Sequence, residues 1–445
     1  MHSLKACPQK ASMQKELRKM NMSHKDKWLA MKNEIDSRGA NGSDIVELIQ
    51  DYYSVFEDRM LVWLAGLYDP DVGGFYYSNS GRDNEFVNYN GVEYPLLPDI
   101  ESTNQATNFL IGNKVFKNGA DFPEQMVKKM AQFVCERQDP ETGFFYHPQW
   151  PKALTDSYPS RRGRDHAWSI QMSQKFNFKL PYPTASERLE QKTENKEGLQ
   201  KLPEYLTSED RFIAYLKSKD WDNQPYLYGN EIAAQAWMLE SAGLADTVVN
   251  FFNSIMNPET GFWGIKQSGY DAINAYLKIS SIYRVTNRPI PNSDKAARTV
   301  VECAASDEQV GATCLQYNAW FSLCNILQNL REFGGNDGCA KAKDIALDCL
   351  KNSSAAITST KEKALIFKRE DGSFSMGPKY SCATSQGMPV AINHSEEGDV
   401  NATVICSSGT AEWMLEAFDL KDYIVPIFSE NSKEIFLSAL KSAEK

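Results

Sequence analysis

The sequence lacks the features that mark several common protein classes. The 445-residue chain has no run of 18 apolar residues, the length that a membrane-spanning helix needs, and its first residues contain no apolar core like that of a signal peptide. Its nine cysteines are scattered without a CxxC pair, which is typical of free thiols in a reducing compartment and not of a disulfide framework. We therefore expect a soluble, cytoplasmic protein without a membrane partner.

Charge and motif content exclude further functions. The formal net charge is −10, so no broad basic surface is available to bind the phosphates of a nucleic acid. The chain has no P-loop, no dinucleotide-binding glycine fingerprint, no HExxH zinc motif and no serine elbow, so we predict neither a cofactor nor a metal. Strand-like alternation of apolar and polar residues is also scarce, which favours an all-α fold.

One short pattern, by contrast, occurs four times. In each copy an acidic or amide residue, a turn and a glycine lead into an aromatic residue, at 69–75, 139–144, 257–262 and 370–374. The glycines at 74, 143, 261 and 372 are 69, 118 and 111 residues apart. The two longer intervals are each about twice a unit of roughly 55 to 60 residues, so the pattern predicts about six structural repeats.

Amphipathic stretches with helical periodicity lie on both sides of these turns. Those before a turn span 45–67, 123–137 and 244–256; those after a turn span 98–110, 164–175, 270–284 and 399–418; two copies without the turn span 229–242 and 312–330. Helical hairpins that cannot bury their apolar faces alone must stack, and six of them can close into a ring. We predict a loosely docked helical arm at 1–42 and one toroid domain at 43–445, with an exposed insertion at 182–206.

The turn and the helix start after it resemble the repeat of the α/α toroids, the fold of terpenoid cyclases and protein prenyltransferases. Asp99 and Thr103, and likewise Asp399 and Thr403, fit the Asp-x-x-x-Thr start of an inner helix. The resemblance covers roughly residues 45–420 and implies an (α/α)6 toroid with a central cavity. Glycoside hydrolases and polysaccharide lyases use the same barrel, so the fold does not decide the function. These four residues can also be simple helix caps.

The resemblance allows a direct comparison with the acid motif of class II terpene cyclases, DxDDT. At 399–403 the position of the central, proton-donating aspartate is occupied by Asn401, which cannot act as a strong acid. The segment 99–103 places Glu101 there instead. No magnesium-binding DDxxD motif is present. A cyclase of terpene or prenyl type is therefore an alternative.

A second cluster suggests a saccharide cleft. It contains aromatic, basic and acidic side chains within 23 residues: Tyr146, His147, Trp150, Arg161, Arg162, Arg164, Asp165, His166 and Trp168. Aromatic faces stack on sugar rings, and arginine binds carboxylates through two hydrogen bonds. In the elimination of a uronic acid, His166 or a tyrosine would serve as the base while an arginine neutralises the carboxylate. The arginines can equally pair with carboxylates on neighbouring hairpins.

The remaining candidates are polar residues at other inner-helix starts. Tyr270, Asp271 and Asn274 form one group, and Glu231 comes after an aromatic segment. An inverting glycosidase needs two carboxylates roughly 6.5–9.5 Å apart. The carboxylates available for such a pair are Glu101, Asp165, Glu231, Asp271 and Asp399. The leading hypothesis is thus a carbohydrate lyase or hydrolase acting on a small-molecule or oligosaccharide substrate; the alternatives are the cyclase and a non-catalytic binding toroid.

Overall fold

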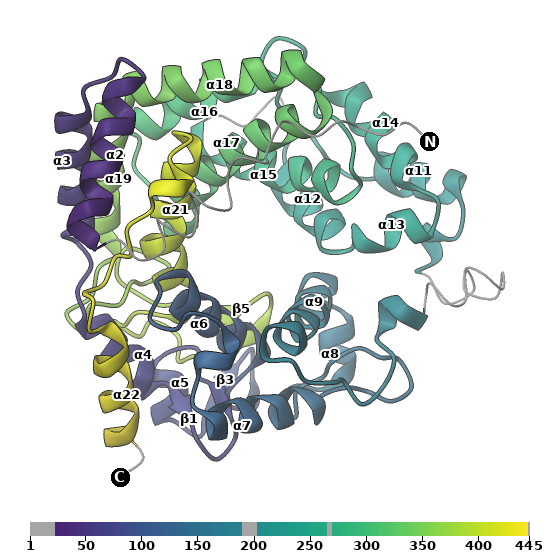
Figure 1. Cartoon of the computed structure of the whole chain (residues 1–445). Helices are drawn as coiled ribbons and strands as arrows, with labels where there is room; N and C mark the ends of the chain where they lie inside the picture. The colour runs from purple at the N-terminus through teal and green to yellow at the C-terminus, as the bar shows by residue number, and fades with distance from the viewer. Residues whose placement is uncertain (1–22, 189–202, 265–268, 444–445) are drawn as a thin grey trace.

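The computed structural model describes residues 23–188, 203–264 and 269–443, and helices dominate it. Six inner helices form a ring around the centre of the molecule (Figure 1). They are α6 (Ile100–Gly112), α9 (Pro159–Phe176), α12 (Pro225–Ala234), α15 (Gly269–Val285), α17 (Thr313–Phe333) and a composite helix of α20 (Val400–Val404), η4 (Ile405–Gly409) and α21 (Thr410–Ala417). Each contacts the next, and α20 contacts α6, so the ring is closed.

An outer helix precedes each inner helix. The outer set consists of α4 (Arg59–Gly66), α7 (Glu124–Cys135), α11 (Glu209–Lys217), α14 (Ala245–Ile255), α16 (Ser293–Ala305) and α19 (Ser353–Phe367). The pairs make six helical hairpins, so the predicted all-α (α/α)6 toroid is confirmed. The two copies inferred without a turn signature contain α12 and α17.

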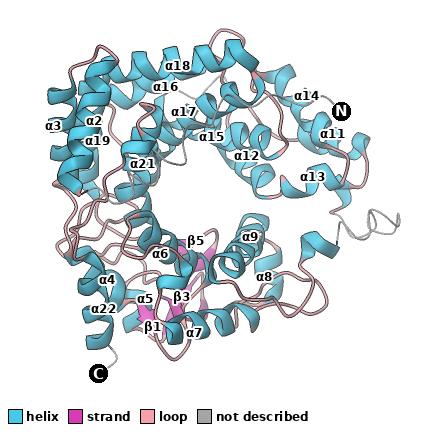
Figure 2. Ribbon diagram, in the orientation of Figure 1, coloured by secondary structure: helices cyan, strands magenta, loops and turns pink. Residues whose placement is uncertain are grey.

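Shorter and peripheral elements complete the described part of the chain. The further α-helices are α2 (His24–Ser37), α3 (Gly42–Tyr53), α5 (Asn79–Asp83), α8 (Lys152–Asp156), α13 (Trp237–Ser241), α18 (Gly335–Lys351) and α22 (Ser432–Ala443). The strands, shown in Figure 2, form three antiparallel pairs: β1 (Tyr68–Asp69) with β2 (Gly74–Phe75), β3 (Phe86–Tyr89) with β4 (Val92–Pro95), and β5 (Thr384–Ser385) with β6 (Met388–Pro389). Among the residues described, no helix has both the length and the apolar character that crossing a bilayer requires.

The repeated turn is built by side-chain caps. Asp69 accepts hydrogen bonds from the backbone N–H groups of Asp71 and Val72, and Asp139 does the same two and three residues further on. The glycine in the left-handed region is Gly73 (φ 82°) in the first copy, not Gly74, which lies in β2. Gly143, Gly261 and Gly372 have the predicted role, with φ of 74°, 73° and 87°.

The turn is tied to the start of the inner helix in two copies. The Thr103 hydroxyl accepts from the Phe75 N–H at 2.9 Å, and the Thr403 hydroxyl accepts from the Phe374 N–H at 3.0 Å. Both phenylalanines are completely buried. The Asp-x-x-x-Thr pattern therefore has a structural role in joining each turn to its inner helix.

Of the two boundary expectations, that of a loosely docked arm needs correction. Within the predicted loose arm, α2 packs on α3, and Met31 and Ile35 are completely buried. The arm is therefore firmly docked over 24–37, while residues 1–22 lie outside the described part. The predicted exposed insertion is of mixed exposure where it is described: Tyr182 is 42% exposed, whereas Thr184, Ala185 and Leu206 are 4%, 8% and 1% exposed, and residues 189–202 lie outside the description.

Candidate functional site

Arg161 is the centre of a buried ionic cluster between α6 and α9. Its guanidinium donates to Asp99 at 2.9 Å, Glu101 at 3.0 Å and Asp165 at 2.8 Å, and none of these side chains is more than 1% exposed. Arg164, one helical turn further on, binds the second oxygen of Glu101 at 3.2 Å. The cluster joins the first turns of two adjacent inner helices.

The cluster sets the charge of its members. Burial raises the pKa of Glu101, against the opposing effect of Arg164 and Arg161. Burial also works against ionisation of Asp165, but Arg161 and His147 outweigh it and hold its pKa below the usual value. Because these carboxylates are enclosed and already bound to arginine, they serve to fix the helices and are closed to a substrate.

His147 and Trp150 belong to the same buried cluster. His147 is 2% exposed; its Nδ1 accepts from Arg137 at 3.2 Å, and its Nε2 lies 3.5 Å from Asp165. Burial lowers the pKa of His147, partly offset by Asp165, so the imidazole is neutral at physiological pH. The Trp150 indole lies 4.7 Å from the Arg161 guanidinium and donates to the Pro389 carbonyl at 3.0 Å.

Asp399 is a buried carboxylate that lies outside this ionic cluster. It caps α20, accepting from the Ala402 N–H at 2.7 Å and the Met376 N–H at 3.1 Å, and it is completely buried. Among the described residues it has no ion pair with lysine, arginine or histidine. Burial raises its pKa to about 7, opposed by the backbone hydrogen bond from Ala402 and the Tyr77 hydroxyl. Asp399 is therefore largely protonated below neutral pH.

A third group of side chains meets inside the ring. Tyr226 on α12 interacts with Arg164 on α9, Asn274 on α15 and Cys314 on α17, and all of them influence the Tyr226 hydroxyl. The Lys278 ammonium on α15 lies 5.6 Å from the centre of the Tyr226 ring. Since α9 and α15 are separated in the ring by α12, side chains from both can meet only on the inner side.

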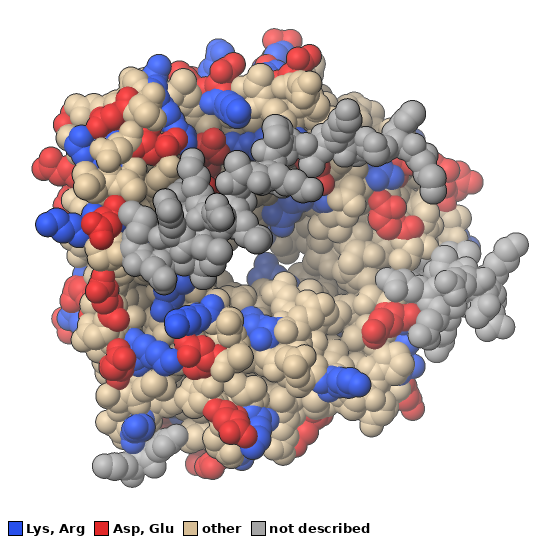
Figure 3. Space-filling view, viewed as in Figure 1, with Lys and Arg blue, Asp and Glu red and all other residues tan. Residues whose placement is uncertain are grey.

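Electrostatics in this interior group favour an anionic ligand. The pKa of Lys278 is lowered to about 8, mainly by burial and in addition by Arg164, while Cys314 opposes the shift. Arg164 is 27% exposed, and its guanidinium lies 5.6 Å from the Trp168 ring. Lys278 has no ion pair among the described residues and Arg164 has one, with Glu101, so these two neighbouring cations gain from a further anion placed beside them. Figure 3 shows an opening at the centre of the ring, with lysine and arginine atoms beside it.

Several predicted site residues lie elsewhere. His166 is 3% exposed; its ring stacks on Trp237 at 4.9 Å, and burial lowers its pKa to about 4. The structure does not bring it together with the interior group. Arg162 pairs with Asp156 at 3.1 Å, and Tyr146 donates to the same carboxylate at 2.8 Å.

The other predicted residues divide between structural contacts and the ring interior. Tyr270 receives a hydrogen bond from Lys363 at 3.0 Å and is buried, whereas Asp271 is exposed. Glu231 accepts from the Tyr215 hydroxyl, away from the ionic cluster. Asn401 accepts from Gln105 at 3.0 Å, which joins the last inner helix to the first.

Residue-by-residue reasoning from the sequence missed three residues of the interior group. Tyr226, Lys278 and Cys314 were not among its candidates. Tyr226 and Cys314 each stand second in their helices, and this place at an inner-helix start was the available signal. Lys278 lies nine residues into α15, where most of its neighbours in sequence are buried, so only a charged residue in an apolar segment marked it.

The comparisons with known proteins leave the family open. No protein-family model and no curated protein matches the sequence. One solved structure is similar over most of the chain, a type II terpene cyclase from Scytonema in complex with its substrate geranylgeranyl dihydroxybenzoate. The identity is 11%, the TM-score is 0.40, and the match covers 85% of this chain and 99% of that chain. The expected carbohydrate substrate gets no support from this comparison. At this level of similarity, function has to be argued from the side chains.

Proposed function

We propose that the chain is an enzyme that binds an anionic, hydroxyl-rich substrate inside the toroid and acts on it by proton transfer. The substrate class that fits best is an oligosaccharide containing a uronic acid. The observation that supports this proposal is the meeting of Arg164, Tyr226, Asn274 and Lys278 from three inner helices. Cations bind the carboxylate, amides bind hydroxyl groups, and aromatic faces support sugar rings.

The reaction that these groups can perform is a β-elimination. The neutral amine of Lys278 takes the proton from the carbon next to the uronate carboxylate, and Arg164 stabilises the charge that develops on that carboxylate. The electron pair of the broken C–H bond forms a carbon–carbon double bond as the glycosidic C–O bond breaks. Tyr226 donates its proton to the departing oxygen. Lys278 and Tyr226 thus replace His166, which is enclosed elsewhere.

The first experiment measures the double bond directly. Turnover of a uronate-containing oligosaccharide produces new ultraviolet absorbance, and its rate rises with pH through about 8 as Lys278 loses its proton. Lys278→Met and Tyr226→Phe should each lower kcat by about a hundredfold or more. Arg164→Met should raise KM and also lower kcat, because the guanidinium binds the carboxylate and stabilises the charge that develops on it.

The matched control is Lys343→Met, which removes an exposed lysine from the peripheral helix α18 and should leave the rate unchanged. A broad panel of uronate oligosaccharides that gives neither turnover nor binding would contradict the proposal. Binding without turnover would instead identify a non-catalytic binding toroid.

A second candidate function rests on Asp399. A buried carboxyl with a pKa of about 7 is protonated at mildly acidic pH and can start an acid-initiated cyclisation of an alkene or epoxide. The cations Arg164 and Lys278 disfavour a carbocation inside the ring, so this function ranks second. Cyclase activity on a prenyl-chain substrate that survives Asp399→Asn together with Glu101→Gln would eliminate Asp399 and Glu101 as its proton donors.

A further inference from the structure

A separate cavity lies at the other ends of the inner helices. It has a volume of about 280 Å³ and is bounded by Tyr53 of α3, Lys114 after α6, Ser408 and Glu412 of the last inner helix, and the segment 424–427. Eleven residues of α6, about 17 Å at about 1.5 Å per residue, separate Glu101 from Gly112 at this cavity. The cavity is therefore distinct from the groups described above.

Glu412 is the unusual residue of this cavity. Its carboxylate is partly buried, and within the described residues it has neither a hydrogen bond nor an ion pair. Burial raises its pKa, and Lys421 and Lys114 only partly oppose that shift. Glu416, one turn later on the same helix, differs, because it pairs with Lys421 at 2.8 Å and accepts from Gln328. The free-energy cost of a partly desolvated carboxylate without a partner is offset by a ligand that supplies a positive charge or a hydrogen-bond donor.

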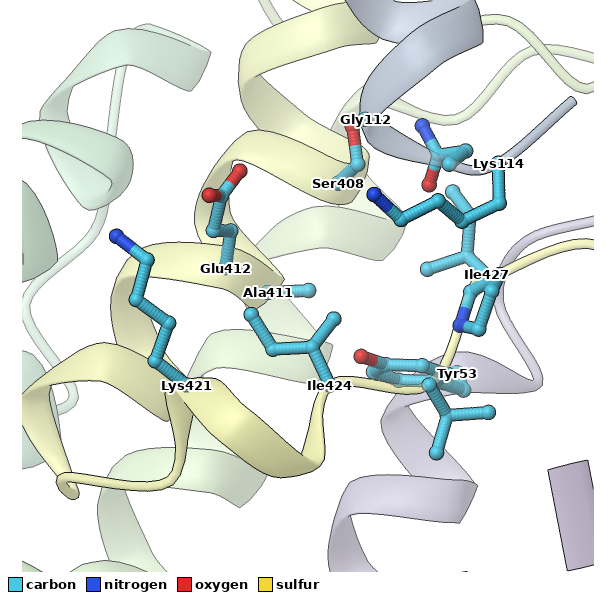
Figure 4. Close-up of a pocket in the computed structure, with 12 residues that line it drawn as sticks. Tyr53, Gly112, Lys114, Ser408, Ala411, Glu412, Lys421, Ile424 and Ile427 are labelled. Atoms are coloured by element: carbon cyan, nitrogen blue, oxygen red, sulfur yellow. The ribbon is translucent and has the colours of Figure 1, made fainter. Parts of the chain in front are cut away.

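Lys114 lies across the cavity from Glu412 (Figure 4). The two side chains are close enough to interact electrostatically, yet no ion pair of 4.0 Å or less joins them among the described residues. In Figure 4, Ser408 lies near Lys114, and the Tyr53 hydroxyl points into the cavity from below. The space between Glu412 and Lys114 therefore suits a ligand that has both a positively and a negatively charged group.

Apolar residues complete the cavity. Ile424 and Ile427 contribute to its wall beside Ala411, so a ligand there meets hydrocarbon as well as charge. Ser408 lies in the π-helical turn η4, in which Ser407 has non-helical angles (φ −96°, ψ −106°). Such turns inside α-helices often occur at functional sites, and this one turns the helix where it borders the cavity.

We propose that this cavity binds a free apolar α-amino acid. The ligand's ammonium binds Glu412, its carboxylate binds Lys114 and Ser408, and its side chain packs on Ile424 and Ile427. A volume of about 280 Å³ is sufficient for a ligand of this size. This binding site is independent of the reaction proposed for the ring interior.

The test is isothermal titration of the full chain with L-leucine and with two partial ligands. These are 4-methylpentanoate, which lacks the ammonium, and 3-methylbutylamine, which lacks the carboxylate. We expect saturable binding of leucine, with both partial ligands at least tenfold weaker. Absence of leucine binding, or partial ligands of equal affinity, would overturn the proposal.

Variants locate the binding. Glu412→Gln and Lys114→Met should each weaken leucine binding at least tenfold, whereas Lys117→Met, an exposed lysine outside the cavity, should leave it unchanged. Because Glu412 has no partner to lose, Glu412→Gln should keep the thermal midpoint of the parent. Unchanged leucine affinity in that folded variant would refute the assignment. Since binding is measured without turnover, an inactive ring interior does not affect the result.

Discussion

Asp99 and Asp399 occupy equivalent positions in two repeats, yet only one has a cation beside it. Each caps an inner helix by accepting from the N–H group three residues later, at 3.0 Å and 2.7 Å. Asp99 also binds the Arg161 guanidinium at 2.9 Å. Asp399 has backbone N–H groups and Tyr77 instead. The same short motif thus places a carboxylate at the start of each helix, and the neighbouring repeat decides whether it gains an ion pair.

The raised pKa of Asp399 predicts a pH dependence of stability. Its folded pKa of about 7 exceeds the unfolded value of 3.8, so between these values the folded state binds the proton and the unfolded state does not. Stability relative to Asp399→Asn should therefore fall as pH rises from about 4 to 7, by at most about 1.4 kcal/mol per pH unit. Above about pH 7 the difference should be constant. Urea unfolding of both proteins across this range measures it, and parallel curves would contradict it.

Arg161 should matter for stability because it serves three buried carboxylates. Arg161→Met leaves Asp99, Glu101 and Asp165 without their shared cation, which should lower the free energy of unfolding by about 3–5 kcal/mol. Arg211→Met removes an arginine that is 57% exposed and paired with an exposed glutamate, so it should cost less than about 1 kcal/mol. Equal losses in the two variants, measured by denaturant unfolding, would show that the cluster does not stabilise the fold.

At the scale of the element, the repeated turn packs closely against a later segment of the chain. Gly143 and Gly243 both have positive φ, 74° and 69°. A Cβ at Gly143 would lie 2.5 Å from the Pro183 carbonyl oxygen, whereas one at Gly243 would meet nothing within 4 Å. Gly243→Ala should therefore cost only backbone strain, about 1–2 kcal/mol. Gly143→Ala should cost about 1–3 kcal/mol more because of the clash. Thermal unfolding of both variants measures this difference in stability. Equal losses in the two variants would show that the turn at Gly143 does not pack closely against Pro183.

These elements also show what the sequence could predict. The turns and helix starts were predictable because Asp69 or Asp139 binds N–H groups only two or three residues away. Pairing of the arginines with carboxylates of neighbouring hairpins was one alternative, but the partners were not predictable, because Arg161 reaches Glu101 across 60 residues. Glu101, for example, was identified as a candidate acid, but its pairing with Arg161 and Arg164 was not.

Which side chains of an inner helix point inward was harder still to predict. That depends on the rotation of each helix about its own axis, and an inner helix is packed on nearly every side. In α15 most residues are buried, so helical periodicity does not single out the face that carries Lys278. The π-helical turn η4 shifts the face again within the last inner helix, and neither periodicity nor capping residues predict such a turn.

At the scale of the whole molecule, closure of the ring determines how it unfolds. In an open stack of hairpins the terminal repeats separate from the rest with little effect on distant repeats. Here α20 contacts α6, Tyr52 donates to the Cys406 carbonyl at 3.1 Å, and α22 packs on α4. Segments from both ends of the described chain therefore lie against the same part of the ring.

Because the ring is closed, a destabilising substitution in the C-terminal helix α22 should lower the stability of every repeat. Phe436 of α22 is completely buried and lies edge-on to Phe116 at 5.7 Å, so Phe436→Ala should lower the free energy of unfolding by about 3–5 kcal/mol. In a closed ring all repeats lose the same free energy of unfolding. Hydrogen exchange should therefore accelerate by a similar factor in α6, close to the substitution, and in α15, three inner helices away. Mass spectrometry of peptides from both helices measures the two rates. Accelerated exchange in α6 with an unchanged rate in α15 would mean that the repeats unfold separately, because only an open array confines a loss to the hairpins nearest to it.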